Sequence, residues 1–225
     1  MKRLITLAAA ALLIVGGVTV WQSTQSGPGT SFELPGMATA QTTETDAEPP
    51  EVLEMALGAE DAPLTIIEYA SFTCPHCKNF HKGAFQQIKT DYIDTGKVRF
   101  VYREVYFDRF GLWAGMVARC AGPERYFGIT DMIYDQQAEW TAGGDPATIA
   151  ENLRTIGRTA GMTTDELNAC LTDADKAQAM IAEYEANAEA DGVRSTPAFL
   201  IDGELITGNK SFEDFAEIID AKLGE

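Results

Sequence analysis

Two cysteines lie three positions apart in the run Cys74-Pro75-His76-Cys77. A thiolate is the form of cysteine that attacks or leaves in disulfide exchange, so a lowered thiol pKa favours that chemistry. Pro75 lacks a backbone N–H and has a fixed φ, which suits the first turn of a helix, and His76 can place a positive charge near the first sulfur. The motif therefore predicts that Cys74 is a reactive thiol. Cys77, one helical turn further on, would attack a mixed disulfide formed on Cys74.

Half of a zinc site is the main alternative for this cysteine pair, with His76 or His81 as a further ligand. The sequence has no second C-x-x-C or H-x-x-x-H pair that would complete such a site. We therefore expect neither a metal nor another cofactor. We also expect His81 to be a solvated helix residue without a role.

The residues around the pair predict the elements that position it. Residues 64–69 form a short, β-branched apolar run that is typical of a buried strand. Apolar residues recur at helical spacing from Cys77 to about residue 93, and residues 98–105 predict a second strand. A strand–turn–helix arrangement places Cys74 at a helix N-terminus, where unpaired N–H groups and the helix dipole stabilise a thiolate.

The rest of the chain predicts an α/β domain interrupted by helices. Residues 109–190 are helical in pattern, with a capping box formed by Thr163 and Glu166. Strand character returns in two short apolar runs separated by Asp202-Gly203, a strong hairpin signal, and a final helix follows. We expect one α/β domain over residues 51–225 with a helical insertion over about 109–190.

Two further features have two interpretations each. Glu68 lies inside the first apolar strand, either at an edge facing water or buried as a proton acceptor for Cys77. Thr196-Pro197 directly precedes a strand, and its peptide bond is either an ordinary trans bond or a cis bond in a loop facing the cysteine pair. In the second case the backbone of Thr196 is left to pair with an extended substrate.

The N-terminal residues predict export. Lys2 and Arg3 precede an apolar run that ends at Trp21, so we assign residues 1–22 to an export signal or a membrane anchor. Residues 23–50 are rich in Gly, Pro, Thr and Ser and predict a flexible linker. We expect a periplasmic protein, with tethering to the inner membrane left open.

Charge and the remaining cysteines narrow the function further. The net charge of −17 argues against nucleic acid or anionic lipid as partners. Outside the cytosol, four cysteines can pair in three ways. Because an unpaired thiol beside an oxidising centre would be a liability, we expect a structural disulfide between Cys120 and Cys170. Two buried free thiols are the alternative.

The run from Glu68 to Cys77, the segment 196–199 and the helical insertion together resemble the DsbA-like thiol–disulfide oxidoreductases of the thioredoxin superfamily. The resemblance covers about residues 53–223 and implies a thioredoxin-like fold with an inserted α-helical domain. It implies Cys74 as nucleophile, Cys77 as resolving thiol, Pro197 as a cis proline and Glu68 as a buried acid. The pair Cys120 and Cys170 is a departure from the simplest members of that family.

These observations predict an oxidase that donates its Cys74–Cys77 disulfide to exported, unfolded polypeptides with free thiols. The resemblance implies reoxidation by a membrane quinone-linked partner. A reductase or isomerase with the same fold, and a non-enzymatic periplasmic chaperone or binding module, are the alternatives. The linker carries no heptad pattern, so we expect a monomer.

Overall fold

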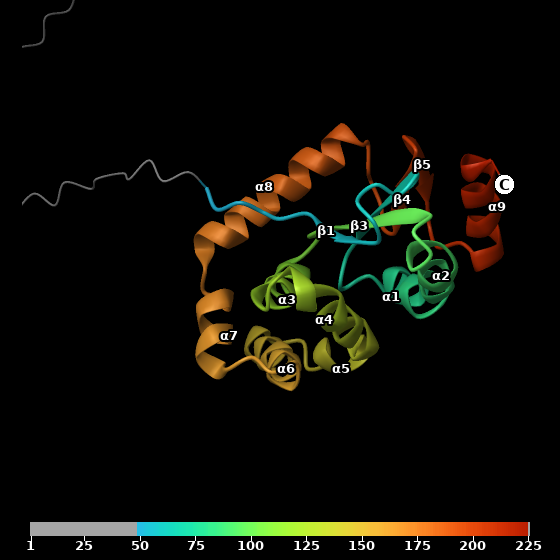
Figure 1. Cartoon of the computed structure of the whole chain (residues 1–225). Helices are drawn as coiled ribbons and strands as arrows, with labels where there is room; N and C mark the ends of the chain where they lie inside the picture. Colours follow the sequence, from blue (N-terminus) through green and yellow to red (C-terminus); the bar gives the residue numbers. More distant parts are fainter. Residues whose placement is uncertain (1–48, 225) are drawn as a thin grey trace, which may run out of the picture. The chain divides into compact units, whose positions relative to one another are not determined.

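A computed structural model describes residues 49–224 (Figure 1). The predicted export segment, nearly all of the predicted linker and the expectation of a membrane tether concern the residues outside that range. Within residues 49–224, no helix combines the length and the apolar character needed to cross a membrane.

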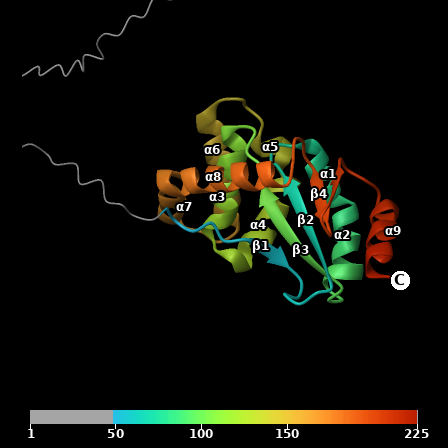
Figure 2. The ribbon, with the colours of Figure 1, turned by 90° about the horizontal axis from the view of Figure 1, so that it is seen from above.

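The centre of the described part is a mixed five-stranded sheet (Figure 2). Its strands are β1 (Met55–Leu57), β2 (Leu64–Ala70), β3 (Val98–Glu104), β4 (Ala198–Ile201) and β5 (Glu204–Thr207). Their order is β1-β3-β2-β4-β5; β2 and β3 are parallel and the other pairs are antiparallel. The strand β1 escaped prediction because three residues are too few to show an alternating pattern.

The hairpin predicted at Asp202-Gly203 is confirmed, since β4 and β5 pair across it. Both residues have positive φ, 49° and 77°, which is the conformation that a tight two-residue hairpin turn requires. Asp tolerates this left-handed conformation better than most non-glycine residues, and Gly adopts it without steric cost.

The alternation of side chains along β2 determines what faces the cysteine pair. Leu64, Ile66 and Ala70 belong to the main core, whereas Tyr69 belongs to a second cluster on the other face. Because side chains alternate with a period of two, Glu68 points to the same face as Ile66 and Ala70. The strand therefore directs a carboxyl group into the main core.

Four helical segments cover the face of the sheet that carries the main core. Three follow the cysteine motif in sequence, and the fourth is the last helix of the chain. They are α1 (Pro75–Lys82), α2 (Ala84–Ile88), the π-helical segment η1 (Lys89–Ile93) and α9 (Phe212–Leu223). The single helix expected over residues 77–93 is therefore wrong in detail: Gly83 leaves the helical conformation, with φ −117° and ψ −103°. Phe80 of α1 packs against Phe215 of α9, with ring centroids 5.4 Å apart.

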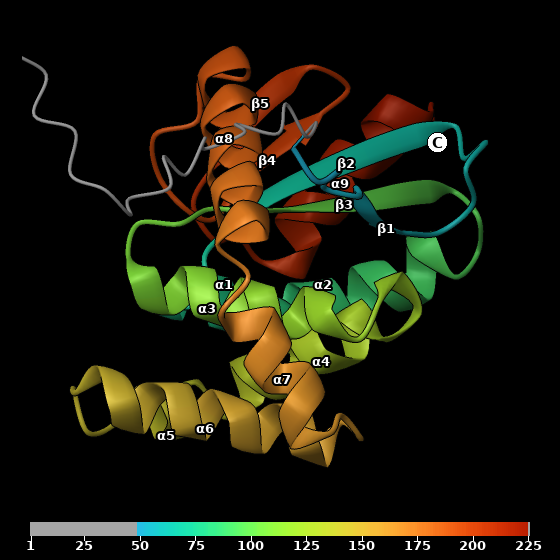
Figure 3. The same ribbon diagram turned by 90° about the vertical axis from the view of Figure 1, so that its left-hand side faces the viewer.

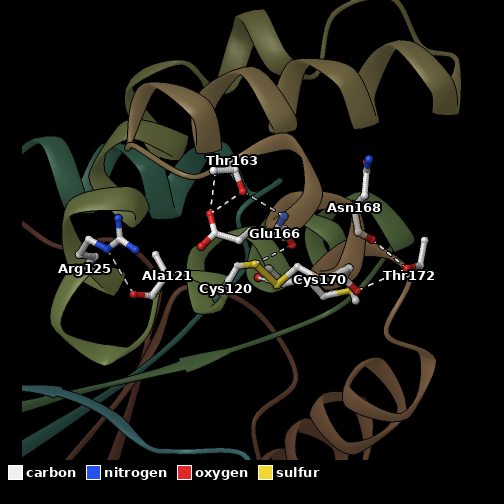
Figure 4. The surroundings of a disulfide bond; sticks show 10 residues. Cys120, Ala121, Arg125, Thr163, Glu166, Asn168, Cys170 and Thr172 are labelled. Atoms are coloured by element: carbon white, nitrogen blue, oxygen red, sulfur yellow. Dashed lines mark hydrogen bonds between the residues drawn. A yellow bond between two sulfur atoms is a disulfide. The ribbon is translucent and has the colours of Figure 1, made fainter.

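The predicted helical segments between β3 and α8 form a block. They are α3 (Arg109–Cys120), α4 (Pro123–Asp135), α5 (Gln137–Trp140), α6 (Pro146–Thr159) and α7 (Thr164–Leu171). The helix α4 of this block packs against α1. The block shares one hydrophobic core with the sheet. Figure 4 shows Cys120 at the end of α3 joined by a disulfide to Cys170 in α7, with Cα atoms 5.9 Å apart, beside the capping box of Thr163 and Glu166.

The long helix α8 (Ala174–Ala190) differs from the other helices of the predicted insertion because it packs on the opposite face of the sheet (Figure 3). Its Ala188 joins Tyr69 and Ala198 in the second apolar cluster. Arg103 of β3 donates to the Tyr69 hydroxyl at 2.7 Å and to the Asp191 carboxylate at 3.0 Å. These polar contacts hold the end of α8 against the sheet.

Candidate active site

The cysteine pair lies where β2 has ended and α1 begins. Cys74 precedes the helix in an extended conformation, and Pro75 is the first helical residue. The Cys74 side chain is half-buried, whereas Cys77, one turn into the helix, is completely buried. Both are free thiols in this structure. Only Cys74 is therefore accessible to another molecule.

The two thiols have opposite acidities. The pKa of Cys74 is lowered to about 5, chiefly because the Cys77 thiol donates a hydrogen bond to its thiolate. This pKa is lowered further by hydrogen bonds from the Thr196 side chain and from the backbone N–H groups of Cys77 and His76. Burial acts in the opposite direction and raises it. Burial raises the pKa of Cys77 far above that of a free thiol, and the charge of Glu68 adds to the rise. The pair therefore combines a stable outer thiolate with an inner thiol that holds its proton.

His76 contributes to this arrangement through its backbone. Its side chain is exposed, as is that of Pro75, and its N–H is among the donors that favour the Cys74 thiolate. This is the chemistry of an unpaired helix N-terminus, which follows from the position of the motif in the chain.

The loop before β4 lies against the Cys74 thiol. The Thr196–Pro197 peptide bond is cis, which is the second of the two interpretations left open by the sequence. The Cys74 Sγ lies 3.5 Å from the Thr196 carbonyl oxygen, in a geometry that lets the thiol donate. Pro197 is buried and Thr196 is half-buried. The backbone carbonyl of Thr196 thus borders the Cys74 sulfur.

A cleft of about 430 Å³ opens beside Cys74. Its walls combine an apolar ring, a carboxylate and a guanidinium with the cysteine and the loop before β4. They are formed by Thr73, Cys74, Phe107, Asp108, Arg194, Ser195 and Thr196. Phe107 is 56% exposed, the highest value among the large apolar side chains of the described part. The cleft therefore offers an apolar contact and both signs of charge next to the Cys74 sulfur.

Glu68 and His81 form a buried pair behind the cysteines. Glu68 is fully buried on a central strand, so the interpretation as an edge residue facing water is wrong. The expectation that His81 is solvated is also wrong: it is 2% exposed, and its Nε2 lies 2.9 Å from the Glu68 Oε2. The spacing explains the error, because His81 follows Cys77 by four positions and so shares the buried face of α1.

The pair has a chemical consequence for Cys77. Burial raises the pKa of Glu68, and its contact with His81 lowers it in part. A carboxyl group with a raised pKa can hold a proton near neutral pH and exchange it with a nearby thiol. Within residues 49–224, no group of three or more His, Cys, Asp or Glu side chains is arranged to hold a metal ion.

Two residues that the sequence did not single out hold the motif in place. Gln137 donates from Nε2 to the carbonyl oxygens of Phe72 at 2.7 Å and of Cys74 at 3.1 Å. Tyr134 stacks on the His81 ring, with centroids 4.5 Å apart, and its hydroxyl donates to a backbone carbonyl of the same loop. Both come from the helical block, and no local pattern links them to the motif.

The chain matches the family model described as Thioredoxin over residues 51–221. It is 34% identical over 173 residues to a Rickettsia bellii protein whose name contains the words protein-disulfide oxidoreductase, covering 76% of this chain and 65% of that protein. The chain thus spans less than two thirds of that relative. It is 23% identical to Disulfide bond formation protein D of Bacillus subtilis, covering 74% of this chain and 76% of the relative.

Two solved structures are similar to this chain over most of its length. The crystal structure of alpha-DsbA1 from Wolbachia pipientis is 28% identical, with a TM-score of 0.71, over 78% of this chain and 93% of that one. A protein-disulfide isomerase from Novosphingobium aromaticivorans is 26% identical, with a TM-score of 0.68, over 76% of this chain and 98% of that one. The predicted thioredoxin-like fold is confirmed. The chain belongs to the thioredoxin family and resembles its DsbA-like members.

Proposed function

We propose that this protein is a thiol–disulfide oxidoreductase that works as an oxidase, passing its Cys74–Cys77 disulfide to thiol pairs in exported, unfolded polypeptides. The observation that carries the proposal is the division of acidity within the pair. A stabilised Cys74 thiolate favours the reduced protein, and a disulfide whose reduced form is stabilised is a strong oxidant.

The reaction proceeds in two exchanges. A substrate thiolate attacks the Cys74 sulfur of the disulfide, a mixed disulfide forms, and Cys77 leaves as a thiolate. Because burial raises the pKa of Cys77, that sulfur takes up a proton, for which Glu68 is the nearby buried acid. A second substrate thiolate then attacks the substrate sulfur of the mixed disulfide and expels Cys74 as its thiolate. Two substrate thiols are oxidised and one protein disulfide is reduced.

The cleft beside Cys74 supports a polypeptide substrate. The backbone of Thr196 lies next to the sulfur, where an extended chain can pair with it, and the exposed ring of Phe107 offers an apolar contact. By resemblance, the reduced protein returns to the disulfide form through a membrane quinone-linked partner. We further propose that it acts as a monomer in the periplasm.

The test is the oxidation of a reduced dithiol peptide by the oxidised protein, compared among variants. Cys74→Ala should lose all oxidation above background, and Cys77→Ala should accumulate mixed disulfides with the peptide because no internal thiol resolves them. The double variant Cys120→Ala/Cys170→Ala is the matched control, because it removes two cysteines that lie away from the cleft; it is assayed at a temperature at which urea denaturation shows it folded. Equal activity of Cys74→Ala and wild type would refute the proposal in favour of a chaperone or binding module.

An isomerase is the second candidate, because one similar solved structure carries that name. For an isomerase, the reduced protein would rearrange a fully oxidised, scrambled substrate, and this rate would exceed the rate at which the oxidised protein forms new disulfides. Measuring both rates on one substrate distinguishes the two activities.

A further inference from the structure

Three buried polar atoms of the described part have no hydrogen-bond partner: Glu68 Oε1, His81 Nδ1 and Thr130 Oγ1. They come from β2, α1 and α4: Glu68 of β2 contacts His81 of α1, and α1 packs against α4. Buried polar groups are ordinarily paired, so three unpaired atoms at one junction call for a functional explanation.

His81 is the residue that connects this junction. Its Nε2 lies 2.9 Å from the Glu68 carboxylate, and its Nδ1, on the other side of the ring, is directed away from Glu68. Tyr134 stacks on the ring from α4, at an interplanar angle of 25°. Thr130 and Asp131 lie one turn before Tyr134 on the same face of α4, and the charge of Asp131 interacts with His81. Asp131 is exposed, so its carboxylate can exchange protons with solvent.

The two tyrosines that face the His81 ring, from β3 and α4, are weak acids that stay neutral. Tyr102 of β3 lies 5.5 Å from it, between ring centroids, and hydrogen bonds to the Tyr134 hydroxyl at 2.7 Å. Burial raises the pKa of both tyrosines. Phe85 of α2 supplies an apolar ring at 4.7 Å. Glu68 and Asp131 are therefore the carboxyl groups between which His81 can pass a proton. The charges of Asp135, Lys82 and Lys89 also act on Asp131 at the surface.

We propose that His81 relays protons between Glu68 and solvent at the α1–α4 junction, and so restores the acid that protonates Cys77. The inference rests on the proposed function, in which Cys77 leaves as a thiolate and takes a proton from Glu68. The imidazole gives the proton at Nε2 to the Glu68 carboxylate and takes another at Nδ1 from the side of Asp131. When the protein is reoxidised, the proton moves outward by the reverse steps. His81 is thus a positioning residue that acts through Glu68.

The test measures single-turnover reduction of the oxidised protein by a dithiol peptide, from about pH 5 to about pH 8, in light and heavy water. Glutamine at position 81 can still donate to Glu68 but does not titrate. We expect the reduction of His81→Gln to be roughly tenfold slower than that of wild type near pH 7. Glu68→Gln, which loses the acid itself, should be slower by about 10²-fold or more. The difference in rate between His81→Gln and wild type should become smaller toward pH 5. The solvent isotope effect of His81→Gln should differ from that of wild type.

Two surface variants serve as a matched pair. Asp131→Asn should slow the reaction in the same direction as His81→Gln. Glu124→Gln, which removes a charge of the same sign from the exposed first turn of α4, should match wild type. A wild-type pH profile for His81→Gln, with Glu68→Gln slow, would overturn the relay and leave the proposed function intact. A fast Cys74→Ala would instead overturn the proposed function.

A measurement on the unmodified protein covers the case in which His81→Gln does not fold. The chain has two histidines, His76 and His81, so ¹⁵N spectra of the imidazole rings are simple to assign. We expect the His81 ring nitrogens to shift between the oxidised and reduced proteins, because the proton load of Glu68 changes. Identical His81 resonances in both forms at every pH would overturn the relay.

Discussion

The acidity of Cys74 leads to a prediction about its neighbour Cys77. The largest contribution to the low Cys74 pKa is a hydrogen bond from the Cys77 thiol. Replacing Cys77 by Ala removes that donor, whereas replacing it by Ser keeps a hydroxyl donor at the same position. We therefore expect Cys77→Ala to raise the pKa of Cys74 and Cys77→Ser to leave it low.

The size of the effect follows from the hydrogen bond and the exposure of the sulfur. A hydrogen bond to a charged group contributes about 1.5–3 kcal/mol, and one pKa unit corresponds to about 1.4 kcal/mol. Cys74 is half-exposed, so solvent screening brings the expected rise to the lower end, roughly one pH unit. With a pKa of about 5, Cys74 is about 99% thiolate at pH 7, against about 3% for a free thiol of pKa about 8.5.

Iodoacetamide alkylation of the reduced proteins, quenched at short times from about pH 3 to about pH 9, reports the titration of Cys74. In wild type, modification should map to Cys74 with a midpoint near pH 5. The Ala variant should show a midpoint about one pH unit higher and the Ser variant a midpoint close to wild type.

Two results would refute this reasoning. A wild-type midpoint near the free-thiol value of about 8.5 would show that the helix N-terminus and its donors do not stabilise the thiolate. Coincident midpoints for the Ala and Ser variants, both shifted, would show that the side chain at this position acts by packing and not by donation.

Three other predictions concern stability. Replacing Cys120 and Cys170 by Ala releases a cross-link that spans 50 residues and should lower the free energy of unfolding by about 4 kcal/mol, measured by urea denaturation; an unchanged midpoint would contradict it. Glu104→Ala leaves the side chain of Arg119, 8% exposed, without its carboxylate partner and should lower the free energy of unfolding by about 3–5 kcal/mol in the same assay. A loss as small as that of a surface ion pair would contradict the buried geometry. Burial raises the pKa of Glu68 above its usual 4.5, so its contribution to stability is complete below that pH and is lost as the pH rises through the folded-state pKa. Glu68→Gln should therefore gain in stability relative to wild type as the pH rises, and parallel pH profiles of the two proteins would exclude this.

The local sequence determined where the cysteine pair lies in the fold. A Cys-Pro-His-Cys run after a β-branched strand and before apolar residues at helical spacing predicts a thiol at a helix N-terminus, because strand, turn and helix propensities are all local. The same holds for the hairpin at Asp202-Gly203 and for the capping box of Thr163. Each depends on residues a few positions apart, so each was predictable without tertiary structure.

The tertiary structure decided what surrounds that thiol. Whether Glu68 faces water or the core depended on strands β3 and β4, which pair on either side of β2 and come from distant parts of the chain. The partnership of Glu68 with His81 required α1 to lie on the face of the sheet that Glu68 enters. Gln137 and Tyr134 reach the motif only because the helical block packs back onto α1. Contacts between residues far apart in sequence leave no periodic pattern, and for this reason the groups that tune the site emerged from the fold and not from the motif.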